Sequence, residues 1–250
     1  MKRTVLAVLF LSLLGAVSVV PAFADAAIYT NGPSTYNTSA WTIIGGSTAV
    51  SGSLSGFSVS DSFTVPWNTK VSGVNFVAWL DSGDSITGVD WSIGTTPFGA
   101  TLDSGVAIPT ATLVTADNGD GYEIDSEYFS VTPGLSLDTG TTYYLTLDNA
   151  SVANPPVVYD SNFNNTGGPG YVAWDESNGP SLAAGSFAGG DGGFWGSAYS
   201  NQPLIDLNLP GASASESFQV IGATPEPGSF LLLGTGLAGL AGLLRFKFKA

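Results

Sequence analysis

Two pairs of neighbouring acidic residues are the first candidates for chemistry in this chain of 250 residues. Asp125 and Glu127 lie two apart in the run GYEIDSEYFSV, and Asp175 and Glu176 are adjacent in WDESNG. Residues two apart in a strand point to the same face at about 6 to 7 Å, within the range of the paired carboxylates of glycoside hydrolases. Paired acids on the solvent face of a strand are also expected in any acidic domain. A carboxylate-pair glycoside hydrolase is therefore our third hypothesis.

The residues that are missing exclude most other catalytic sites. The chain has no His and no Cys, which excludes Ser-His-Asp triads, Cys-His pairs, and zinc or iron sites that need His ligands. Between Asp25 and Thr224 the single basic residue is Lys70, against nineteen Asp and Glu, so this span carries about eighteen net negative charges. Nucleic acid is excluded as a partner because phosphate contacts need clustered Lys and Arg. We predict that the protein is not an enzyme and has no catalytic residues.

Calcium is the one metal that the sequence favours. The run ADNGDGYEID supplies Asp117, Asp120, Glu123 and Asp125 within nine residues, and Ca²⁺ binds six to eight such oxygen ligands. The spacing is not that of an EF-hand, and a hairpin loop turned by Asn and Gly is the alternative. We take Asp117, Asp120 and Asp125 as the candidate calcium ligands. No cofactor is required by this interpretation.

Aromatic side chains in a glycine-rich segment are the candidates for glycan binding. The run GSFAGGDGGFWG, Gly185 to Gly196, has six glycines in twelve residues and is predicted to be a long loop. Phe194 and Trp195 in this run, with Tyr199 just beyond it, would either stack on sugar rings or plug the core. Trp79 and Trp91 lie in alternating runs and are predicted core residues.

The elements that must position these residues are strands. Five runs rich in Val, Ile, Thr and aromatic residues, each bounded by turn residues, predict strands at 56–66, 71–81, 86–94, 121–131 and 141–150. No stretch between Asp25 and Thr224 has a sustained helical period. The sequence predicts an all-β fold, a two-sheet antiparallel sandwich that is jelly-roll-like. Within 86–94, we expect Val89, Trp91 and Ile93 to share the core face.

The N-terminus reads as a secretory signal peptide over residues 1–24. Lys2 and Arg3 precede an apolar run, and Ala22 and Ala24 fit the small-residue rule of signal peptidase. Cleavage after Ala24 would leave Asp25 as the first residue of an extracytoplasmic domain over 25–224.

The C-terminal residues 225–250 combine three elements in order. Pro225, Glu226 and Pro227 come first, and an uncharged run, 230–244, follows. This run makes a helix of about 22 Å, short for a bilayer core of about 30 Å. A basic tail, 245–250, then favours the cytoplasmic side of the inner membrane. We predict a single short transmembrane helix there.

This C-terminus closely resembles the PEP-CTERM sorting signal of Gram-negative bacteria. The resemblance implies that an exosortase, a membrane cysteine protease, recognises Pro225, Glu226 and Pro227. It also implies that the protein is anchored transiently in the inner membrane, cut near the motif and passed to the cell surface or the exopolysaccharide matrix. The segments WDESNGPSLA and SESFQVIG are similar to segments of β-sandwich ectodomains that carry this tail.

Three hypotheses about function follow from these residues and this resemblance. The leading one is a monomeric, exported structural protein of the surface or matrix, linked to exopolysaccharide or biofilm, whose processing partners are signal peptidase and an exosortase. A non-catalytic carbohydrate-binding module is the alternative. The carboxylate-pair hydrolase is the third.

Overall fold

The computed structural model describes residues 25–32, 41–48, 52–54, 56–115, 122–154, 169–187, 199–203 and 214–224. The chain divides into two units. Ala26–Gly222 holds the fold described below, and of the unit formed by Met1–Asp25 and Ala223–Ala250 only Asp25, Ala223 and Thr224 are described. The predicted signal peptide, 1–24, and the predicted sorting signal, 225–250, lie outside the described residues.

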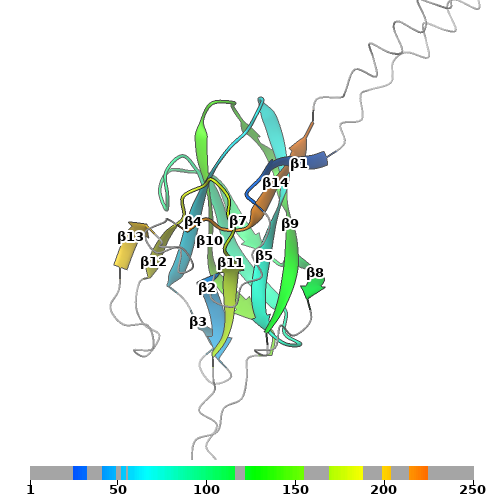
Figure 1. The fold of residues 1–250 in the computed structure, drawn as a ribbon, viewed down its shortest axis with the longest axis vertical. Coiled ribbons are helices and arrows are strands. Elements are labelled where there is room, and N and C mark those ends of the chain that lie inside the picture. The colour runs from blue at the N-terminus through cyan, green and yellow to red at the C-terminus, as the bar shows by residue number, and fades with distance from the viewer. Residues whose placement is uncertain are drawn as a thin grey trace, which may run out of the picture. The chain divides into compact units, whose positions relative to one another are not determined.

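The described residues form fourteen strands and no helix (Figure 1). In chain order the strands are β1 (Asp25–Thr30), β2 (Trp41–Thr48), β3 (Gly52–Leu54), β4 (Phe57–Thr64), β5 (Thr69–Asp81), β6 (Ile86–Gly94), β7 (Thr101–Ala107), β8 (Thr110–Thr115), β9 (Tyr122–Leu137), β10 (Thr142–Val152), β11 (Pro169–Asp175), β12 (Ala184–Phe187), β13 (Tyr199–Pro203) and β14 (Phe218–Ala223). The all-β prediction is confirmed.

One set of strands is built around β5. Strand β9 pairs with β5 along its whole length, and β8 pairs with the far side of β9. On its other side β5 pairs first with β14 and then, at Ala78 and Trp79, with β11. Strand β2 lies beyond β11, β3 beyond β2, and β1 beside β14.

A second set is built around β10, which pairs with β4 on one side and β6 on the other. Strand β7 lies outside β6, while β12 and β13 extend the set beyond β4. Where the paired residues of two strands are defined, the strands run antiparallel in every case except one. The exception is the parallel bridge between Ala150 of β10 and Gly45 of β2. This bridge joins the two sets into one large mixed sheet, so the expectation of purely antiparallel pairing is wrong at this point.

Glycine is required at the bridge for a steric reason. Gly45 has φ of 154°, and a Cβ built on it would lie 2.3 Å from the backbone N and O of Ala150. Any larger residue would force the two strands apart.

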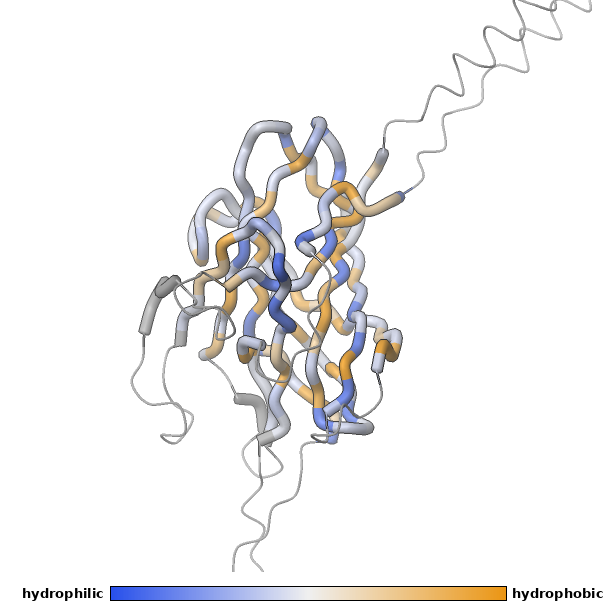
Figure 2. Tube along the Cα trace, in the orientation of Figure 1, coloured by the Kyte–Doolittle hydropathy of each residue, from blue (hydrophilic) through white to orange (hydrophobic). Residues whose placement is uncertain are grey.

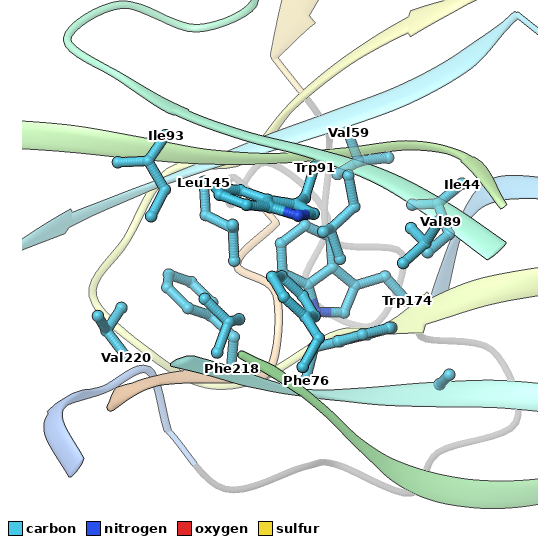
Figure 3. Packing of buried hydrophobic residues seen from close by; sticks show 14 of the residues in the cluster. Ile44, Val59, Phe76, Val89, Trp91, Ile93, Leu145, Trp174, Phe218 and Val220 are labelled. Carbon is cyan, nitrogen blue, oxygen red and sulfur yellow. The ribbon is translucent and has the colours of Figure 1, made fainter. Parts of the chain in front are cut away.

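The core lies between the two sets of strands, and alternation along each strand fills it. Figure 3 shows Val59, Trp91, Ile93 and Leu145 on one side, facing Phe76, Phe218 and Val220 on the other. The Phe76 ring meets the Trp174 ring edge-on, with centroids 6.3 Å apart. The ring packing adds specific geometry to the burial of apolar area.

The predicted core face of the strand at 86–94 is confirmed, and β5 alternates in the same way. Val89, Trp91 and Ile93 are all buried in the main core cluster. On β5, Phe76 and Ala78 face the same cluster, whereas Trp79 belongs to a second cluster on the opposite face. The same alternation of orange and blue runs along the tube in Figure 2.

The predicted glycine-rich loop is wrong at its start. Gly185 to Phe187 form part of β12, where Gly185 pairs with Val59 and Phe187 with Phe57 of β4. The open edge of β4 offers backbone hydrogen bonds that compensate for the low strand propensity of this run. Residues 188–198 lie outside the described residues.

Among the described residues, no helix has the length and apolarity needed to cross a bilayer. The helix predicted at 230–244 lies outside them. The jelly-roll order of the strands stays a prediction.

Candidate functional site

The acidic pair Asp125 and Glu127 lies on one face of β9, but that face is the interior one. The two residues pair with Ala78 and Phe76 of β5, which face the main core. Their exposed fractions are 6% and 1%. The expectation that these carboxylates lie on a solvent face is therefore wrong.

The carboxylate oxygens of this buried pair have few hydrogen-bond partners. One oxygen of Asp125 and both oxygens of Glu127 are buried without a hydrogen-bond partner. Burial, reinforced by the neighbouring Asp125, raises the pKa of Glu127 to about 7. Burial and the nearby Glu123 also raise the pKa of Asp125. At neutral pH the pair therefore holds protons more readily than free carboxyl groups would.

Only one of the three candidate calcium ligands lies among the described residues. Asp125 lies on β9, while Asp117 and Asp120 lie outside the described residues. Within the described part of the chain, no three acidic residues are grouped so that they could hold a metal ion. Calcium binding stays a prediction of the sequence.

The second acidic pair, Asp175 and Glu176, meets a segment far away in the chain. Glu176 forms a bridge with Glu216, and the backbone N–H of Ser217 donates to the carbonyl of Asp175 at 2.7 Å. The Trp79 indole N–H donates to the Asp175 carboxylate, also at 2.7 Å. All three acidic residues are buried. WDESNG and SESF, two of the segments singled out in the sequence, are thus neighbours in space.

Asn31, which directly follows β1, is the centre of this interior network. Its side-chain N–H₂ lies within hydrogen-bond distance of four acceptors from three other segments of the chain. These acceptors are the Asp61 carboxylate at 3.1 Å, the Ser215 hydroxyl at 2.8 Å, the Glu216 carbonyl at 2.5 Å and the Ser181 hydroxyl. Asn31 is fully buried, so its contacts join the first strand of the domain to β4 and to the segment before β14.

Asp61 is the most fully hydrogen-bonded carboxylate of the network. Besides Asn31, it accepts from the Ser181 hydroxyl at 2.7 Å, the Glu216 backbone N–H at 2.7 Å and the Ser62 backbone N–H at 2.6 Å. Burial raises its pKa to about 7, although these hydrogen bonds oppose the shift.

Glu216 is the carboxyl group of the network with the fewest hydrogen bonds. It is fully buried, and neither of its carboxylate oxygens meets hydrogen-bond geometry. Burial raises its pKa well above the usual range, and Asp61 and Glu176 raise it further. Thr42 lies near enough to oppose the shift in part. Because Lys70, the one basic residue of the domain, is exposed, we expect Glu216 to be a neutral acid in the folded protein.

Sequence reasoning missed this network. Asn31, Asp61, Ser181 and Glu216 lie far apart in the sequence, so no local pattern brings them together. The available signal was the repeated small-polar and acidic run, DES at Asp175–Ser177 and SES at Ser215–Ser217.

The aromatic candidates for glycan binding are mostly outside the described residues. Phe194 and Trp195 lie there, while Tyr199 begins β13 and pairs through its backbone with Phe187. The structure adds a different exposed aromatic, Tyr128 of β9, with 41% of its surface exposed. A Cβ on Gly73 would come within 2.6 Å of the Tyr128 ring and its hydroxyl, so this end of the side chain lies over the glycine.

The residues predicted for processing lie at the limits of the described chain. Ala22, Ala24, Pro225, Glu226 and Pro227 are outside it, and Asp25 is the exposed first residue of β1. A protein-family profile, described as the PEP-CTERM protein-sorting motif, matches residues 223–245. This match includes all three predicted recognition residues. No curated protein is similar enough to the chain to count as a match.

Proposed function

We propose that this chain is an exported, non-catalytic protein of the bacterial cell surface or extracellular matrix, associated with exopolysaccharide or biofilm. The observation that carries the proposal is the sorting motif at 223–245, which implies export and sorting by an exosortase. The source would be a Gram-negative bacterium. Its protein would be held briefly in the inner membrane by a helix at 230–244 after signal peptidase removes residues 1–24.

The burial of both acidic pairs supports a non-catalytic role. The exposed fractions of Asp175 and Glu176 are 0% and 4%, as low as those of Asp125 and Glu127. A polysaccharide must bring its scissile bond between two carboxyl groups, and side chains this deeply buried offer no such access. We propose that these acids have a structural role within the fold and no catalytic one. We take this fold to be a jelly-roll-like sandwich.

Glycan binding is the second candidate function, and Tyr128 is the observation that favours it. The outward side chains beside its ring include Asn75 and Ser126, whose side chains hydrogen-bond at 2.9 Å. An exposed ring with uncharged hydroxyl and amide neighbours suits a neutral sugar. Affinity electrophoresis in neutral polysaccharide gels tests this: Tyr128→Ala should lose retardation, while Tyr144→Ala on β10 should keep it. Equal mobility of wild type and Tyr128→Ala in every gel would reject this surface.

The leading proposal is tested by the glutamate of the sorting motif. Cells producing Glu226→Ala should accumulate the full-length precursor in the inner membrane, because the protease would no longer recognise the motif. Ser229→Ala, a change in the same linker that keeps Pro-Glu-Pro, is the matched control and should be processed like the wild type. If Glu226→Ala reaches the surface or medium as efficiently as the control, the motif does not direct sorting.

A further inference from the structure

Exposed apolar side chains are concentrated in one segment of the described domain. Five of its exposed large hydrophobic residues fall within residues 102–114. These are Leu102, Val106, Ile108, Leu113 and Val114. Val106 and Ile108 are exposed by 75% and 76%, which is unusual for residues in or next to a strand.

The same segment forms two open edges. Among the described strands, β7 pairs only with β6, and β8 pairs only with β9. Only two residues, Ile108 and Pro109, link β7 to β8, so the chain passes directly from the edge of one set of strands to the edge of the other. An edge strand presents unpaired backbone N–H and C=O groups that can pair with another chain.

Charge does not protect these edges. Proteins commonly place Lys or other charges on an edge strand to prevent pairing. Residues 101–115 contain one charged residue, Asp103, in a domain that holds nineteen acidic residues. This strongly acidic domain thus keeps the edge nearly neutral.

We propose that β7 is a self-association edge, at which two copies of this chain pair their β7 strands antiparallel about Ser104. In this register Leu102 lies opposite Val106 of the second copy, and Asp103 lies opposite Gly105. The single charge therefore meets no like charge, and each apolar side chain meets another. A twofold axis through the pair makes every contact occur twice.

This self-complementarity indicates that the partner of β7 is a second copy of the same chain. Leu102, Ser104 and Val106 are all exposed and share one face of β7, while Asp103, Gly105 and Ala107 share the other. A twofold axis perpendicular to the sheet places the same face of β7 on the same side of the sheet in both copies. The sheet therefore continues from one copy to the next. A dimer joined through β7 would replace the monomer expected from the sequence.

The absence of cysteine makes the test direct, because one introduced cysteine is the only thiol present. Ser104→Cys in the full chain should form a disulfide-linked dimer under mild oxidation, since paired strands bring opposite Cα atoms to about 4.5 to 5.5 Å. Leu182→Cys, at a residue that is 63% exposed away from the edge, is the matched control and should stay monomeric. Dimerisation through any other segment would not favour Ser104→Cys over this control.

A second variant tests the apolar contact. Adding Val106→Lys to Ser104→Cys should lower the yield of dimer by about tenfold or more, because it places a charge on the edge. Circular dichroism should show that the double variant keeps its strand signal, as expected for a change at an exposed position. Equal dimer yields for Ser104→Cys and Leu182→Cys, or no effect of Val106→Lys, would overturn the proposal.

Discussion

At the level of single residues, Asn31 connects the segments that form the interior polar network. It is fully buried and lies within hydrogen-bond distance of acceptors on Asp61, Ser181, Ser215 and Glu216. The network has no basic side chain to assist it, because Lys70, the one basic residue of the domain, is exposed. Buried acceptors left without donors are costly.

Asn31→Ala should lower the free energy of unfolding by about 2 to 4 kcal/mol, because buried acceptors would lose the two N–H groups of the Asn31 amide. Urea unfolding followed by tryptophan fluorescence measures the change. Asn178→Ala, at an exposed asparagine two residues after Glu176, should change the free energy by less than about 0.5 kcal/mol. Equal effects of the two changes would show that the network contributes nothing specific.

The buried acids also predict a direction for the pH dependence of stability. The pKa values of Asp61 and Glu127 are each raised to about 7 in the folded protein, and that of Glu216 is raised well above its usual range. In the unfolded chain such groups titrate near pH 4. The contribution of Asp61 and Glu127 is fully present below that pH and is lost as the pH rises through about 7, by up to about 1.4 kcal/mol per pH unit for each group. Glu216 acts in the same direction.

Stability should therefore fall between pH 5 and pH 8, as measured by urea unfolding at each pH. Glu127→Gln removes one of the responsible groups and should make this decline shallower. Asp138→Asn, which removes an exposed carboxylate instead, should leave the slope unchanged. A stability that rises from pH 5 to pH 8 would show that the buried acids are ionised in the folded protein.

At the level of elements, the join between β2 and β10 depends on one glycine. Gly45→Ala should lower the melting temperature by several degrees, because its Cβ would lie 2.3 Å from the Ala150 backbone. The matched control is Gly88→Ala on β6, where the nearest atom to a new Cβ is at an ordinary 3.4 Å. If both variants melt at the same temperature, the bridge does not constrain the two sets of strands.

The elements were also where sequence reasoning succeeded best. The strand predicted at 86–94 has the same bounds as β6, and the core face of Val89, Trp91 and Ile93 is confirmed. Alternation predicts such a strand because each side chain has one of two environments. It failed for Asp125 and Glu127, since the pattern gives the shared face but not which face meets the core. Nor could it find Asn31 and Asp61, whose partners lie up to 185 residues away.

At the level of the whole molecule, a β domain is followed by a processing signal at the C-terminus. The sorting motif at 223–245 begins at Ala223, the last residue of β14. Cleavage near the motif would therefore leave the strands of the domain intact. The strands described here would then be what reaches the surface, and the tail would serve only to deliver them.

The intact mass of the protein recovered from the cell surface or medium tests this account most directly. We predict a mature chain that begins at Asp25 and lacks residues 245–250, because signal peptidase and exosortase each remove one end. A recovered protein that begins at Asp25 and still ends at Ala250 would contradict the account and show that the tail is an ordinary membrane anchor.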